Sequence, residues 1–122
     1  MKNIFITVAV LISNFLVVPT SLGAPPEQLF SASATITTGQ SSAVLTEVPE
    51  GTTLIVTQFC KSDVMGADLI GSVLGRVPSQ QNSNCTTYIP GVVFDGAQSI
   101  SCVSIFGPAF QDIACLINGV IQ

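Results

Sequence analysis

The chain contains no histidine and no tryptophan, and it has a single tyrosine. Histidine is the commonest general base and the commonest metal ligand in proteins, so its absence removes both. A serine nucleophile would have no imidazole partner. A lysine base is disfavoured because Asp63 follows Lys61 closely and would keep the amine charged. We therefore expect a protein without catalytic residues and without a bound cofactor.

Basic residues are also scarce. Only Lys2, Lys61 and Arg76 are basic, against seven acidic residues, and the formal net charge is −4. Nucleic acids are held by clusters of lysine and arginine that neutralise phosphates and release counterions. Three separated cations cannot form such a cluster, which excludes nucleic acid and anionic membrane surfaces as partners.

Closely spaced cysteines are missing as well. Structural zinc sites use pairs such as Cys-x-x-Cys, whereas the four cysteines of this chain stand far apart, at Cys60, Cys85, Cys102 and Cys115. No metal site is predicted, and an even number of cysteines in a small exported chain indicates disulfides instead. Gly107-Pro108 stands midway between Cys102 and Cys115, and a hairpin there would bring these two face to face. Cys60 would then pair with Cys85.

The first residues have the composition of a secretory signal peptide. After Lys2, residues 4–18 are almost entirely apolar, and the small residues Ser21 and Gly23 suit cleavage by signal peptidase. The apolar run is shorter than the ~20 residues of a membrane-spanning helix. We expect residues 1–23 to be a signal peptide, which leaves 99 of the 122 residues as a secreted or extracytoplasmic chain with no membrane span. That length suits one domain with one core.

The remaining chain has the pattern of a β-rich domain behind a short tether. Pro25-Pro26 predicts an extended tether over residues 24–30. Over residues 31–122, runs of Val, Ile and Thr alternate with turn residues, which is typical of short strands. Three glycines disfavour a helix over residues 64–77, so one or two strands are expected there. The other strands are expected over residues 31–38, 43–48, 52–59, 85–89, 92–94, 99–105 and 113–121, with turns at Pro90-Gly91, Asp95-Gly96 and Gly107-Pro108.

These elements predict an all-β fold, a single antiparallel β-sandwich that is jelly-roll-like and carries two disulfides. Residues 48–57 (VPEGTTLIVT), 88–96 (YIPGVVFDG) and 116–121 (LINGVI) are similar to the strand openings and closing strand of small jelly-roll domains. Such domains occur in phage and viral fibre tips and in tumour necrosis factor-like and collagen-tail globular heads. The resemblance implies a trimer that binds a cell-surface molecule or another protein through variable loops, so no binding residue is carried over.

The last predicted strand is apolar on both faces. Alternate side chains point to opposite sides of a strand, and here both sets are apolar: Ile113, Cys115, Ile117 and Ile121 on one side, Ala114, Leu116 and Val120 on the other. A two-layer domain covers only one side of each sheet. We expect the second side to be covered by another copy of the chain, in a homo-oligomer, or by Leu29 and Phe30 of the tether.

The leading functional hypothesis is an exported, non-enzymatic binding or structural module with a protein or glycan partner. The alternative is a small secreted glycan hydrolase, which needs two carboxyl groups ~5 to 9 Å apart across a cleft. Its candidates are Asp63, Asp68, Asp95 and Asp112. The first three stand in predicted loops and are also candidates for binding Ca²⁺. Turn formation explains these aspartates more simply.

Overall fold

The computed structural model describes residues 27–62 and 66–122. The predicted signal peptide, residues 24–26 of the predicted tether and Asp63 lie outside these residues. Within them the chain forms eight β-strands and no helix. The strands are β1 (Gln28–Ile36), β2 (Ser42–Val48), β3 (Thr53–Lys61), β4 (Ala67–Gly71), β5 (Gly75–Val77), β6 (Cys85–Asp95), β7 (Gln98–Ser104) and β8 (Ile113–Ile121). Among the described residues, no helix has the length and apolar character needed to cross a membrane.

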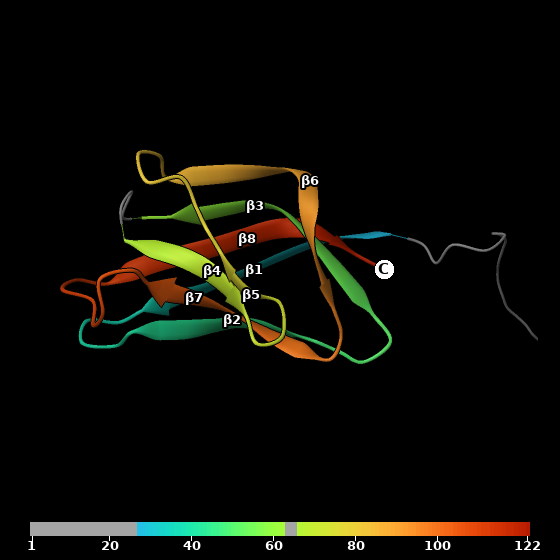
Figure 1. The fold of residues 1–122 in the computed structure, drawn as a ribbon, viewed down its shortest axis with the longest axis horizontal. Coiled ribbons are helices and arrows are strands. Elements are labelled where there is room, and N and C mark those ends of the chain that lie inside the picture. The colour runs from blue at the N-terminus through green and yellow to red at the C-terminus, as the bar shows by residue number, and fades with distance from the viewer. Residues whose placement is uncertain (1–26, 63–65) are drawn as a thin grey trace, which may run out of the picture.

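The strands form two antiparallel sheets of four strands each, packed face to face. The first sheet has the order β1-β8-β3-β6 and the second has the order β2-β7-β4-β5 (Figure 1). Except between β4 and β5, each connection carries the chain from one sheet to the other. This order is that of an eight-stranded jelly roll. The predicted all-β, jelly-roll-like sandwich is therefore confirmed.

The core lies between the sheets because alternate residues of each strand are apolar. In β7 and β8 every second side chain is buried, as in the series Ile113, Cys115 and Ile117. Burial of each large aliphatic or aromatic side chain contributes about 2 kcal/mol to folding. The largest fully buried side chains are Phe59, Phe94, Ile36, Leu54, Leu69, Ile100 and Ile117.

The two disulfides pair the cysteines as predicted, but one of them does so for a different reason. Cys60 and Cys85 are register partners on the neighbouring strands β3 and β6, with their Cα atoms 4.0 Å apart. Cys102 and Cys115 are also bonded, with a Cα separation of 6.4 Å. The expected hairpin between them is wrong, because β7 and β8 belong to different sheets. Their disulfide crosses the core and joins the two layers.

Two further boundaries differ from the sequence prediction. Pro90-Gly91 is not a turn, because β6 continues through it from Cys85 to Asp95. A proline is tolerated there because β6 is an edge strand. No strand lies on its outer side, so a missing N–H on that side costs no hydrogen bond between strands. A side chain at Gly91 would collide with Ile55 of β3, so glycine allows the close approach. Residues 28–30, expected in the tether, already belong to β1 and pair with β8.

The two ends of the sandwich carry different loops. At one end Thr53 and Gln122 exchange backbone hydrogen bonds of 2.9 and 3.0 Å, which fixes the C-terminus beside the start of β3. The turn between β6 and β7 joins this end through a bond from Gly96 N to Thr52 O. The opposite end carries the β1–β2 loop and the β7–β8 loop, which contact each other.

Candidate functional site

The structure does not bring Asp95 and Asp112 together. Asp95 ends β6 and accepts a 3.0 Å hydrogen bond from the hydroxyl of Thr53. Thr53 precedes Leu54, which pairs with Ile121, so Asp95 lies near the C-terminal end of β8. Asp112 immediately precedes β8, at that strand's other end. A strand of nine residues spans roughly 25 Å. This separation is far beyond the reach of a catalytic carboxylate pair.

Asp68 is engaged in a buried polar cluster. It accepts hydrogen bonds from the backbone N–H and the hydroxyl of Ser79, at 2.9 and 3.0 Å, and lies 3.7 Å from a guanidinium nitrogen of Arg76. The Tyr88 hydroxyl donates to the carbonyl of Pro78, and burial, followed by the charge of Asp68, raises the pKa of Tyr88 to about 12. These contacts attach the segment after β5 to β4. We interpret the cluster as structural.

Lys61 was the other residue considered for catalysis, and backbone carbonyls hold its side chain in place. Its side chain is buried, and its ammonium donates to the carbonyls of Gln80 and Ser83 at 2.7 and 3.1 Å. Among the residues that the structure describes, no three acidic or cysteine side chains gather where they could hold a metal ion.

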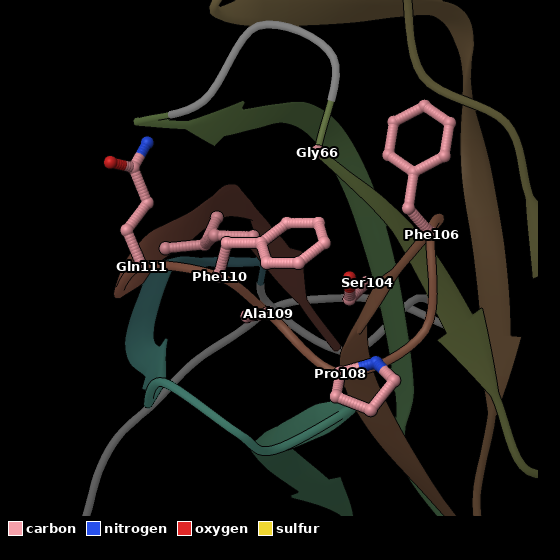
Figure 2. Close-up of a pocket in the computed structure, with 8 residues that line it drawn as sticks. Gly66, Ser104, Phe106, Pro108, Ala109, Phe110 and Gln111 are labelled. Atoms are coloured by element: carbon pink, nitrogen blue, oxygen red, sulfur yellow. The ribbon is translucent and has the colours of Figure 1, made fainter.

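The most distinctive surface feature is the β7–β8 loop, residues 105–112, which we call the phenylalanine loop. Phe106 is 62% exposed and Phe110 is 92% exposed. Figure 2 shows their rings on either side of Ser104, with Pro108 at the turn between them. Exposing two phenylalanines in one short loop leaves a large apolar area in water, which marks a binding surface more often than a structural one.

The β1–β2 loop holds the middle of the phenylalanine loop in place. Ala109 N–H donates to the carbonyl of Gln40, and Gly39 N–H donates to the carbonyl of Ala109, both at 2.9 Å. Ala109 itself is buried. At the start of the loop, Ile105 N–H donates to the carbonyl of Gly66. Backbone bonds to two other segments thus fix the loop just before Phe106 and between its two exposed rings.

Asp112 fixes the end of the loop. One of its carboxylate oxygens accepts from the backbone N–H of Thr38 at 2.8 Å and from the hydroxyl of Thr38 at 3.0 Å. Both bonds have a charged acceptor, which strengthens them. Asp112 was a candidate catalytic residue in the sequence, and the structure gives it a positioning role.

A small recess lies under the phenylalanine loop. Its volume is about 150 Å³, a size comparable to an engineered cavity that accepts one benzene molecule. Most of its wall is apolar, and Ser104 and Gln111 are the lining residues with polar side chains. The lining residues are Gly66, Ser104, Phe106, Pro108, Ala109, Phe110, Gln111 and Ile113 (Figure 2). The recess therefore has room for one aliphatic or aromatic side chain.

Sequence reasoning did not select Phe106 or Phe110. A signal was present, because these residues flank a Gly-Pro turn in a chain with only 7% aromatic residues. Exposure could not be deduced from that pattern, since a loop phenylalanine often folds back onto the core. Here the bonds of Ala109 and Asp112 hold the backbone so that both rings stay at the surface.

A second apolar surface covers the outer face of the first sheet. Register pairs place Leu29, Val120, Ile55 and Val93 in one row, with one residue from each strand. Leu29 is 93% exposed, so it does not cover the face as one of the sequence alternatives required. Phe30 packs against the core instead. The described part of the chain therefore leaves this outer face open.

Comparisons with protein-family models, curated proteins and solved structures give no match to this chain.

Proposed function

We propose that this chain is an exported binding module that recognises a protein partner through Phe106 and Phe110. The observation that carries the proposal is the exposure of both rings on a loop whose backbone is hydrogen-bonded to neighbouring segments. A rigid loop loses little conformational entropy on binding, so most of the contact energy remains available. Burying one phenylalanine side chain is worth about 1.5 to 3 kcal/mol. Two such anchors can form the centre of a protein interface.

The chemistry of the recess favours an apolar side chain as the bound group. A glycan would need several polar partners for its hydroxyls, and the polar side chains that line the recess are those of Ser104, which is buried, and Gln111. The carboxylate of Asp112 is engaged with Thr38. A partner that inserts an aliphatic or aromatic side chain between the two rings would bury apolar surface against this mostly apolar wall.

The disulfides support the exported part of the proposal. Disulfides persist in oxidising compartments outside the cytosol, and this chain has two of them within the described residues. A signal peptide over residues 1–23 would account for the export, and a non-enzymatic role would fit the absence of histidine.

A random-peptide display library panned against the immobilised, oxidised protein tests the proposal. We expect the wild type to enrich peptides that share an exposed apolar residue, and the double variant Phe106→Ser/Phe110→Ser to lose this enrichment. The matched control is Val73→Ser/Leu74→Ser, which removes two other exposed apolar side chains near the start of β7, at the opposite end of the sandwich. Enrichment that survives the loop variant, or that is lost equally in the control, would contradict the proposal.

A further inference from the structure

The sandwich has four edge strands, and they are not equally protected. The edges are β1 and β6 in the first sheet and β2 and β5 in the second. An edge strand presents unpaired N–H and C=O groups along one side, and these can pair with a strand of another chain. Natural proteins block such pairing with short strands, charges, prolines or bulges on the edge.

Three of the four edges carry such devices. β5 has only three residues and contains Arg76. β6 contains Pro90, which lacks an N–H, and ends at Asp95. β2 contains Glu47, and its register with β7 shifts between Val44 and Thr46. Pairing of another strand with any of these edges would meet a missing donor, a charge or an irregular backbone.

β1 carries none of these devices. It has nine residues, QLFSASATI, with no charge, no proline and no glycine. Its pairing with β8 runs without a register shift from Gln28 to Ile36. The inward-facing side chains of Phe30, Ala32 and Ala34 are only partly buried, so the described part of the chain leaves this side of the sandwich open. β1 is therefore a long, regular and unprotected template for strand addition.

We propose that β1 pairs antiparallel with β1 of a second copy of this chain, which joins two four-stranded sheets into one continuous eight-stranded sheet. A two-fold axis through the strand centre gives this arrangement, since identical antiparallel strands are self-complementary under such symmetry. Pairing would add on the order of eight backbone hydrogen bonds.

The side chains of β1 suit a second copy of the same strand. Because β1 has no charge, no like charges face each other across the axis. The central residues, Ser31 to Ala34, are all small, so the two backbones can approach to the spacing of a sheet without side-chain clashes. This inference is independent of the proposal for the phenylalanine loop, which lies on the connection between β7 and β8.

The test is sedimentation velocity of the oxidised protein over a concentration series, combined with hydrogen–deuterium exchange. We expect a dimer at high concentration, and slower exchange of the β1 amides as the dimer forms. Ser33→Lys adds a charge to an exposed position of β1 in both copies, close to the axis, and should raise the dissociation constant at least about tenfold. The matched control is Thr87→Lys on β6, the opposite edge of the same sheet, which should leave the dimer unchanged.

Leu116→Glu separates edge pairing from packing through the outer face of the first sheet. Ser33 and Leu116 are register partners on that same face, so Leu116→Glu alone decides between the two models. Edge pairing predicts that Leu116→Glu still dimerises, whereas face-to-face packing predicts that it dissociates. That second outcome would overturn the proposal, as would a monomeric wild type, a trimer, or a dimer whose β1 amides exchange as fast as in the monomer. Circular dichroism and disulfide mapping of each variant verify that it is folded.

Discussion

Cys102 of β7 and Cys115 of β8 lie in different sheets, and their disulfide joins the two layers through the core. Cys102 is 0% exposed and Cys115 is 2% exposed. The other disulfide lies on the outer face of the first sheet, because Phe59 and Lys61, the neighbours of Cys60 in β3, both point inward. Its second cysteine, Cys85, is exposed. The two disulfides therefore differ in their access to solvent.

Mild reduction of the folded protein should open the Cys60–Cys85 disulfide first. A soluble reductant can reach Cys85, whereas the Cys102–Cys115 disulfide is reached only when the sandwich opens. Alkylation followed by peptide mass spectrometry should show label on Cys60 and Cys85 before any on Cys102 and Cys115. In denaturant the two pairs should react at similar rates, and equal rates in the folded state would contradict the prediction.

Complete reduction should strongly destabilise the fold. Under the loop-entropy account each disulfide contributes about 3 kcal/mol, a large part of the stability of a domain this small. We expect the reduced protein to unfold near body temperature, as measured by circular dichroism during heating. A reduced protein that melts within a few degrees of the oxidised one would show that packing alone holds the two sheets together.

Stability at high pH should depend on Tyr88. Burial and the charge of Asp68 raise its pKa from the ordinary value of 10.0 to about 12, so the folded state holds this proton more tightly than the unfolded state. The contribution is complete below pH 10 and is lost as the pH rises toward 12. Because Tyr88 is the single tyrosine, its ultraviolet absorbance reports this titration alone. Tyr88→Phe should remove the loss of stability that this phenol causes between pH 10 and 12, and an unchanged profile would contradict this.

Asp112→Ala should loosen the phenylalanine loop. The substitution removes both hydrogen bonds to Thr38, which we expect to lower the free energy of unfolding by about 1 kcal/mol. Hydrogen exchange at the Thr38 amide should become faster. Asp112→Asn keeps one oxygen acceptor and should have a smaller effect, so equal effects of the two variants would argue against the hydrogen-bond explanation.

Gly119→Ala in β8 should lower the free energy of unfolding strongly, although it adds only one methyl group. A Cβ atom at Gly119 would overlap with the backbone carbonyl of Ile55, and a backbone atom cannot rotate away as a side chain can. We expect a loss of about 2 kcal/mol or more in the free energy of unfolding, measured by denaturant titration. Ala114→Ser, at an exposed position of the same strand, is the control and should be close to neutral.

Local sequence pattern was sufficient for most of the fold. Alternating apolar residues and turn residues predicted strands that overlap every strand of the structure, because burial of every second side chain is a local property of a strand next to a core. The turn at Asp95-Gly96 was predicted for the same reason, since Asp-Gly favours a tight turn wherever it occurs. The disulfide pairing was also predicted correctly, although the expected hairpin was not found.

The tertiary structure decided what no local pattern specifies. It assigned β7 and β8 to different sheets, which turned the Cys102–Cys115 disulfide into a link across the core. It allowed Pro90 inside β6 because that strand lies at an edge. It also formed the candidate site, since Thr38 and Asp112 are 74 positions apart in sequence and meet only after both sheets have assembled. The physical reason is that exposure of a side chain depends on which distant backbone covers or holds it, and contacts of that range are set by topology rather than by neighbouring residues.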